Sequence, residues 1–218
     1  MKGLDSIPDR SVDCIITDPP YGIDYYSRYY KDGNPFTKIE GDYSFSDAFV
    51  RKMMAKLKLN CCSFIFCDID YSWLQIKQEL GDMYKSTIVW AKNNWTAGDL
   101  TGDFGKQYEL IIYAVKGNFK FTGKRHSNIW NFNRVPPTDL KHPTQKPQEL
   151  IEQMIEIGTK EGDLVLDPFI GSGTTACACK KLNRNFIGFE LNPDYCKIAN
   201  ERLANTFVTK KNYGGYFK

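Results

Sequence analysis

Short apolar runs alternate with helix-like segments along most of the chain, and this alternation restricts its fold more than any other feature. The runs are rich in Val, Ile, Phe and Tyr, and several are apolar on both faces, as buried strands of a parallel sheet must be. The predicted strands span residues 12–18, 61–68, 84–91, 108–115, 164–167 and 185–190. Such alternation predicts an α/β fold whose mostly parallel sheet binds ligands at the carboxyl ends of its strands.

Helical periodicity fills the intervals between these strands. Apolar residues recur every three or four positions in residues 47–59, 71–80, 147–157 and 192–204. Ser46 suits the N-cap of the first helix, and Pro147 suits the first helical position of the third.

Composition limits the chain to an ordinary globular class. Its 218 residues are 42% hydrophobic and 25% charged, which is enough for one domain with a sizeable core. The net charge of +3 is too small to indicate a nucleic acid by itself. No apolar run approaches the roughly 18 residues that span a membrane, and the first residues have no signal core. The seven cysteines lack CxxC pairs, so we expect mostly buried, reduced thiols and no metal site.

The alternation breaks between about residues 93 and 142, where only one run is strand-like. Residues 92–146 contain nine Lys or Arg and four Asp or Glu, a net charge of +5, so the rest of the chain sums to −2. The interleaved aromatic residues are Trp95, Phe119, Phe121, Trp130 and Phe132. Basic and aromatic residues together suit phosphates and unstacked bases. A solvated insertion with a few buried aromatic residues gives the same pattern, and the residues alone favour neither interpretation.

The first candidate site follows the strand at residues 12–18. Asp18 ends the strand and is followed by Pro19, Pro20 and Tyr21. Two prolines stop a strand and stiffen the loop that follows, so a carboxylate, a carbonyl and an aromatic ring stand on a rigid platform. This set suits methylation of an aromatic amine, because Asp18 and the Pro19 carbonyl could accept its two N–H groups while Tyr21 stacks on a flipped base. A Pro-Pro turn after a core strand is the plain structural alternative.

The second candidate site is a glycine-rich turn after the strand at residues 164–167. Gly171 and Gly173 allow a ligand to approach the backbone closely, and Glu190 follows Gly171 by nineteen residues, about the spacing of an acid that binds ribose. The spacing also fits a dinucleotide fingerprint, so an NAD enzyme is an alternative. Asp167 stands just before the turn, where it would repel a pyrophosphate and attract a sulfonium or ammonium. This favours S-adenosylmethionine as the cofactor.

Three motifs in this order resemble the β class of DNA N4/N6 amino-methyltransferases. They are Asp18-Pro-Pro-Tyr21, His142-Pro-Thr-Gln-Lys146-Pro147 and Asp167-Pro-Phe-Ile-Gly-Ser-Gly-Thr-Thr175. The resemblance covers nearly the whole chain. It implies a Rossmann-like, S-adenosylmethionine-dependent methyltransferase fold with one antiparallel strand, in a single catalytic domain over residues 1–218. Residues of about 118–140 would form a short target-recognition insertion.

The resemblance also implies roles for individual residues. The catalytic residues would be Asp18, Pro19, Pro20 and Tyr21. The cofactor would be bound by Asp167, Phe169, Gly171, Ser172, Gly173, Thr174, Glu190, Thr144 and Lys146, with Thr144 and Lys146 near its methionine carboxylate. The basic residues expected to contact DNA are Lys120, Lys124, Arg125 and Arg134.

Asp at the first motif position favours adenine N6 as the target, whereas relatives that act on cytosine N4 more often have Ser there. The alternatives are a cytosine-N4 enzyme, an RNA or protein-amide methyltransferase, and a DNA-binding module with impaired catalysis. The retained acids argue against the last, and the motif order argues against RNA and protein-amide enzymes.

The strand count gives a further expectation. Six strands are predicted where the resemblance implies seven, and too few residues precede Ile7 for the strand that relatives have there, so we expect the sheet to lack an N-terminal strand. An open sheet edge favours a homodimer. The other partners that the resemblance suggests are double-stranded DNA with a flipped base and a cognate restriction endonuclease, in a bacterial or phage-encoded cytoplasmic system.

Overall fold

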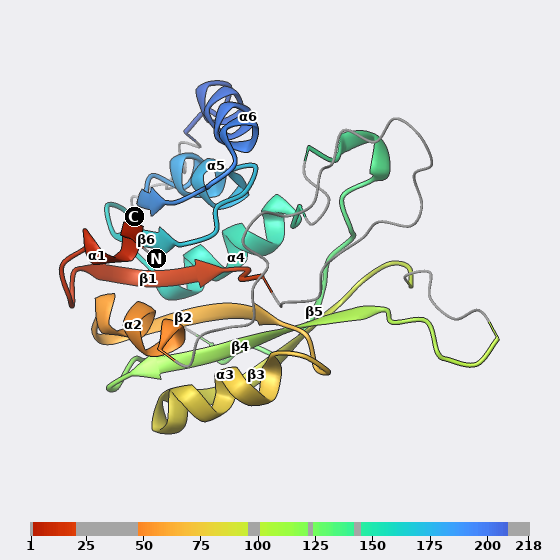
Figure 1. Ribbon diagram of the computed structural model, residues 1–218, viewed down its shortest axis with the longest axis horizontal. Helices are drawn as coiled ribbons and strands as arrows, with labels where there is room; N and C mark the ends of the chain where they lie inside the picture. Colours follow the sequence, from red (N-terminus) through yellow and green to blue (C-terminus); the bar gives the residue numbers. More distant parts are fainter. Residues whose placement is uncertain (1, 21–47, 96–100, 122–123, 142–144, 209–218) are drawn as a thin grey trace, which may run out of the picture.

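The sheet that the alternating pattern predicts is present and has seven strands (Figure 1). The computed structural model describes residues 2–20, 48–95, 101–121, 124–141 and 145–208. The strands are β1 (Val12–Thr17), β2 (Leu57–Cys67), β3 (Tyr84–Ala91), β4 (Tyr108–Lys116), β5 (Ile129–Asn131), β6 (Leu164–Asp167) and β7 (Asn185–Gly188). The helices are α1 (Lys2–Asp5), α2 (Phe49–Lys56), α3 (Trp73–Leu80), α4 (Gln148–Gly158), α5 (Thr174–Lys181) and α6 (Pro193–Ala204), with two 3-10 turns, η1 (Gly81–Met83) and η2 (Pro137–Asp139).

The strand order is β5-β3-β4-β2-β1-β6-β7, and a single strand runs against the others. β1 is parallel to both β2 and β6, β6 is parallel to β7, and β3 is parallel to β5. β4 is antiparallel to both β2 and β3, and its arrow in Figure 1 points opposite to that of β1. The mostly parallel α/β sheet with one antiparallel strand is therefore confirmed.

Two apolar cores lie on the two faces of the sheet. On one face, α4 and α5 pack against strand residues such as Ile16, Phe64 and Ile111. On the other, α1, α2 and α3 cover residues such as Ile15 and Ile65, which alternate with the first set along the strands. α6 packs on α5 and buries no residue fully. Because both faces are covered, ligands have access at the ends of the strands.

The structure corrects the boundary between the first long helix and the strand that follows it, and also the position of Pro147. β2 begins at Leu57, so the helix predicted for residues 47–59 ends at Lys56. The backbone N–H of Ser11 donates to the Lys56 carbonyl at 2.9 Å, and Leu57 pairs with Val12, so contact with β1 draws the chain into an extended form. Pro147 is the N-cap of α4 and not its first helical residue. Ser46 lies outside the described residues.

The count of six strands was wrong, because β5 adds a seventh next to β3. Its middle residue Trp130 is only 5% exposed and joins the core on the face covered by α4. Three residues are too few for a strand pattern to stand out in an irregular sequence. The sheet thus has the seven strands that the resemblance implies, so the strand count no longer supports a missing N-terminal strand. That expectation stays a prediction, and no strand in the described ranges pairs with the outer edge of β7.

All seven cysteines are free, and five of them are buried, as expected. Within the described ranges, no helix combines the length and the apolar character needed to cross a membrane.

Candidate active site

Asp18 stands at the carboxyl edge of the sheet, directly after β1. Pro19 is buried and Pro20 half-buried, so the chain leaves the strand through a rigid segment. The Asp18 side chain is 21% exposed, which leaves it accessible from the edge. Tyr21, the last residue of the predicted catalytic motif, lies outside the described residues, as do residues 142–144 with Thr144.

Asp167 ends β6 at the same edge and is 5% exposed. Its carboxylate accepts the Thr175 hydroxyl at 2.6 Å and the Phe169 backbone N–H at 3.1 Å. The pKa of Asp167 is raised to about 6, mainly because burial disfavours the charged form more than these hydrogen bonds favour it. The charge of Asp18 is a smaller contribution to the same rise. A bound cation would relieve this cost, so the position suits a positively charged ligand.

The parallel pairing of β1 with β6 brings the two acids to one place. Cys14 faces Val165 and Ile15 faces Leu166 in register, so both strands end at the same level of the sheet. Between them, Thr17 has a buried hydroxyl that lies close enough to the Asp167 carboxylate to lower the pKa of that acid. The Thr17 hydroxyl therefore helps to stabilise the charged form of Asp167.

The turn between β6 and α5 depends on its glycines. Gly171 and Gly173 have φ values of 51° and 83°, which favour glycine. A Cβ on Gly173 would lie 2.8 Å from the Cβ of Ala199, so this residue also lets α6 approach α5 closely. The turn is therefore fixed both by its backbone conformation and by the helix packed on it.

Ser172 and Thr174, both predicted to bind the cofactor, contact a helix in this structure. Arg202 on α6 donates to the Ser172 carbonyl at 2.7 Å, to the Ser172 hydroxyl at 2.9 Å and to the Thr174 hydroxyl at 3.3 Å. These contacts hold the turn in place. Direct contact of either side chain with a cofactor stays a prediction.

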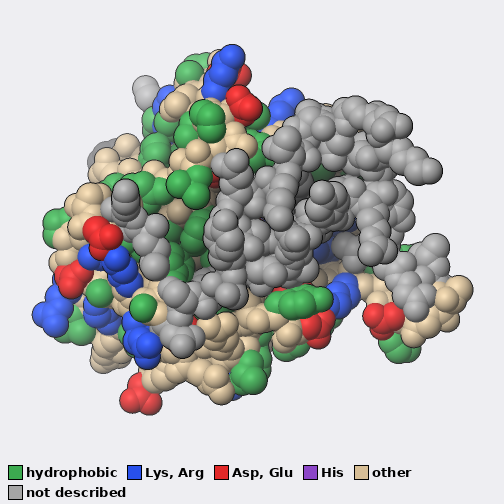
Figure 2. Space-filling view, viewed as in Figure 1, with side chains coloured by type: hydrophobic (Ala, Val, Ile, Leu, Met, Phe, Trp, Pro, Cys, Tyr) green, Lys and Arg blue, Asp and Glu red, His purple; other side chains and the backbone are tan. Residues whose placement is uncertain are grey.

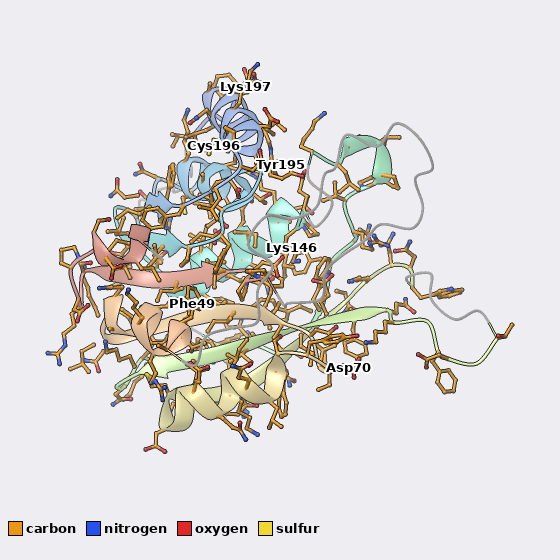
Figure 3. The ribbon with its side chains drawn as sticks, viewed as in Figure 1. Phe49, Asp70, Lys146, Tyr195, Cys196 and Lys197 are labelled. Atoms are coloured by element: carbon orange, nitrogen blue, oxygen red, sulfur yellow. The ribbon has the colours of Figure 1, made fainter. Side chains whose placement is uncertain are left out.

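Phe169 and Glu190 flank the turn. The Phe169 ring is half-buried and lies 5.2 Å from the ring of Phe49, which projects from α2 in Figure 3. Glu190 follows β7 by two residues and accepts the Asn192 backbone N–H at 2.8 Å, just before α6. Because β6 and β7 are parallel, both residues lie at the edge that carries Asp18 and Asp167.

Lys146 lies against Asp18, the acid that the sequence predicts to be catalytic. Its ammonium donates to Asp18 Oδ2 at 2.5 Å and lies 3.1 Å from Glu109 Oε2 (Figure 3 shows its central position). Burial alone would favour neutral lysine, but the attraction of the two carboxylates raises its pKa well above the usual range. The sequence prediction placed Lys146 near the methionine carboxylate of the cofactor, and that contact stays a prediction.

Glu109 and its partner Lys92 are the residues that the sequence analysis missed as site residues. Lys92 Nζ lies 2.6 Å from Glu109 Oε1. A signal was present, because Glu109 is the one acid in the otherwise apolar run of residues 108–115. Burying an acid in such a strand is costly unless a cation accompanies it.

The structure of residues 92–146, where described, agrees in part with both interpretations of this basic segment: contact with DNA, and a solvated insertion with a few buried aromatic residues. Its expected DNA-contacting side chains are accessible: Lys120, Lys124 and Arg125 are exposed and Arg134 is half-buried. Most of its aromatic residues instead serve packing, since Trp130 is buried and Phe119 and Phe132 pack against the core. Trp95 is 67% exposed.

Positive charges at the far end of the molecule are largely neutralised. Figure 2 shows basic and acidic side chains intermixed where α1 and α2 lie. Lys52 pairs with Asp5, and Lys56 lies 2.7 Å from Asp9. No cluster of metal-ligating side chains occurs in the described segments.

Comparisons with known proteins agree with this geometry. A family model described as DNA methylase matches residues 12–201. The chain is 34% identical to the type II methyltransferase M.HpaI of Haemophilus parainfluenzae, over 95% of this chain and 73% of that protein. It is 30% identical to the DNA adenine methyltransferase YhdJ of Escherichia coli, over 92% and 79%. The crystal structure of an M1.HpyAVI–SAM complex superposes with a TM-score of 0.67 at 31% identity, over 88% of this chain and 89% of that one.

Proposed function

The chain belongs to the N4/N6 DNA methylase family, and we propose that its target within that family's chemistry is N6 of adenine. It is an S-adenosylmethionine-dependent DNA methyltransferase that acts on an exocyclic amino group. The observation that carries the proposed site is the register of β1 against β6. This pairing sets the Asp18-Pro19-Pro20 platform beside the Asp167 turn, although the two are far apart in sequence.

The residues at this edge fit S-adenosylmethionine. Asp167 offers a buried carboxylate to a cation, and Gly171 and Gly173 allow a close approach to the backbone. Glu190 stands at the end of the adjacent parallel strand, the position of an acid that binds ribose. When bound, S-adenosylmethionine supplies an electrophilic methyl group on a sulfonium. A pyrophosphate would meet the Asp167 charge unfavourably, which argues against NAD.

Asp18 and Pro19 would activate the target nitrogen. The lone pair of an exocyclic aromatic amine is delocalised into the ring, which makes the nitrogen a poor nucleophile. The carboxylate of Asp18 and the carbonyl of Pro19 can each accept one of its N–H groups, favouring a more pyramidal nitrogen with its lone pair directed at the methyl group. The rigid prolines keep both acceptors in place before the base arrives, which is where such electrostatic stabilisation gains its effect.

The first motif residue favours adenine over cytosine. It is Asp18, and a relative with 30% identity carries the name DNA adenine methyltransferase. Cytosine N4 is the second candidate, because the two amino groups are chemically alike.

Access to the amino group requires the base to leave the helix, so we propose base flipping on double-stranded DNA, with Tyr21 stacking on the flipped base. The insertion of about residues 118–140 would recognise the target. The exposed residues Lys120, Lys124 and Arg125, together with Arg134, would contact phosphates. We also propose a homodimer, since the outer edge of β7 pairs with no strand in the described ranges, and a cognate endonuclease, as the type II relatives suggest.

A transfer assay with matched substrates tests this proposal. The protein is incubated with tritiated S-adenosylmethionine and either unmethylated duplex DNA or an RNA of the same sequence. We expect label in DNA only, and labelling of DNA about 10²–10³-fold slower with the Asp18→Ala variant. Label in RNA alone, or full activity of Asp18→Ala, would overturn the proposal.

A further inference from the structure

Four charged side chains of alternating sign form a continuous chain across the carboxyl edge of the sheet. Asp18 Oδ2 lies 2.5 Å from Lys146 Nζ, which lies 3.1 Å from Glu109 Oε2. Glu109 Oε1 lies 2.6 Å from Lys92 Nζ. The side chains of Asp18, Lys146, Glu109 and Lys92 are 21%, 11%, 30% and 6% exposed. The two lysines are thus largely removed from water, and their charges act on the carboxylates with little screening.

The fold explains why these residues meet. Asp18 follows β1, Lys92 follows β3, and Glu109 is the second residue of β4, which begins at this edge because it runs antiparallel. β2 separates β1 from β4, and Lys146 spans it with its ammonium 4.9 Å from the ring centroid of Phe66. Lys146 therefore ties the segment preceding α4 to the two strands that flank β2, namely β1 and β4.

Lys92 is held more firmly than an ordinary surface lysine. Its backbone N–H donates to the Gln107 carbonyl, and the Gln107 side-chain amide donates to the Lys92 carbonyl, both at 2.9 Å. Its ammonium lies 5.1 Å from the ring centroid of Trp90. One end of the charge chain is thus anchored to the base of the β3–β4 connection.

The four charges sum to zero, and Glu109 supplies one of the two negative charges that neutralise Lys146 and Lys92. Burial alone would raise the pKa of Glu109, but the adjacent Lys146 and Lys92 lower it, so the group is ionised at neutral pH. Without its charge, two largely buried ammonium groups would face a single carboxylate, Asp18. Lys146 would then lose one of the two anions that fix its position.

We propose that Glu109 is a positioning residue for methyl transfer: anchored by Lys92, it holds Lys146 so that the lysine fixes the orientation of the Asp18 carboxylate. The proposal rests on the catalytic role proposed for Asp18. A carboxylate bound at one oxygen by a fixed cation cannot rotate freely, and misplacement of a reacting contact by about 1 Å can cost about 10²-fold in rate.

Stability does not account for this arrangement. A buried ion pair is weak evidence for stability, because desolvation offsets its attraction, and apolar residues of similar size often serve as well. A role in orienting Asp18 gives a reason for an acid in a strand that is otherwise apolar.

The test compares Glu109→Gln with Glu152→Gln, a matched control on α4 whose carboxylate is 15% exposed and pairs with Lys181 at 2.9 Å. Single-turnover methyl transfer to DNA, affinity for S-adenosylhomocysteine and melting temperature are measured for each. We expect Glu109→Gln to transfer about 10²-fold more slowly with unchanged affinity, and the control to match wild type. Lys92→Met, which removes the anchor alone, should slow transfer by a smaller factor, about 10-fold, and serves if Glu109→Gln does not fold.

A double variant separates positioning from a structural role. Because Glu109 acts through Asp18, adding Glu109→Gln to Asp18→Ala should cause no further loss of rate. The proposal is overturned if Glu109→Gln transfers at the wild-type rate, if its effect persists in the Asp18→Ala background, or if the loss follows cofactor affinity. If the wild type does not methylate DNA, or Asp18→Ala is fully active, the proposed function itself fails.

Discussion

Replacing Asp167 by Asn should stabilise the protein at neutral pH while weakening its binding of S-adenosylmethionine. The carboxyl group is 5% exposed, and its surroundings favour the protonated form. Asn resembles that form and carries no charge. It keeps one acceptor oxygen, so it can retain one of the two hydrogen bonds from Thr175 and Phe169.

The magnitude follows from the pKa of Asp167, which is about 6 in the folded protein against 3.8 for the unfolded chain. This difference corresponds to about 3 kcal/mol. Because the folded pKa is the higher one, the stabilisation from this group is complete below pH 3.8 and is lost as pH rises through about 6. Asn avoids that loss but gives up one hydrogen bond worth about 1 kcal/mol. The variant should therefore be more stable than wild type by about 2 kcal/mol at pH 8.

Urea unfolding of both proteins between pH 4.5 and pH 8 checks this, without cofactor. The stability difference in favour of Asp167→Asn should grow through about pH 6 and become constant above about pH 7. Asp139→Asn is the control, because this side chain is exposed on η2, and it should leave the pH dependence unchanged. The reasoning would be refuted if the stability difference between variant and wild type were independent of pH, or if it favoured the variant less at pH 8 than at pH 5.

The remaining predictions concern catalysis, the glycine turn and DNA binding. Asp18→Ala should lower the transfer rate by about 10²–10³-fold while calorimetry finds S-adenosylhomocysteine affinity near wild type; wild-type turnover would contradict the assigned role. Gly173→Ala should destabilise the protein by roughly 1–3 kcal/mol in urea unfolding, because the new Cβ meets Ala199 at a positive φ; an unchanged midpoint would show that α6 yields freely. Joint neutralisation of the basic side chains should lower the log–log salt slope of DNA binding by about 1 per phosphate contact, and an unchanged slope would place DNA elsewhere. These side chains are Lys120, Lys124, Arg125 and Arg134.

The parts of the fold set by local pattern could be predicted from the sequence. Residues 84–91 and 164–167 were predicted as strands with the bounds they have, because their apolar runs end at clear turn signals. The bounds of β2 could not be predicted, because Leu57 becomes extended through its pairing with Val12. β5 could not be predicted for a similar reason, since its pairing with β3 and the burial of Trp130 define it.

The candidate site shows the same division. Asp18, Asp167 and the glycines could be found because each stands at a strand end or in a turn with a recognisable motif. The partnership of Lys146 with Asp18 and Glu109 could not be found, because it joins three segments that meet only in the folded sheet. The contacts of Ser172 and Thr174 with Arg202 likewise depend on how α6 packs.

The identity of the methylated nucleoside tests the central claim most directly. Unmethylated duplex DNA is incubated with the protein and S-adenosylmethionine, digested to nucleosides and analysed by mass spectrometry against standards. The predicted result is that the deoxynucleoside of N6-methyladenine is the sole methylated product. N4-methylcytosine in its place would contradict the adenine assignment drawn from Asp18, and the absence of any methylated nucleoside would contradict the proposed reaction.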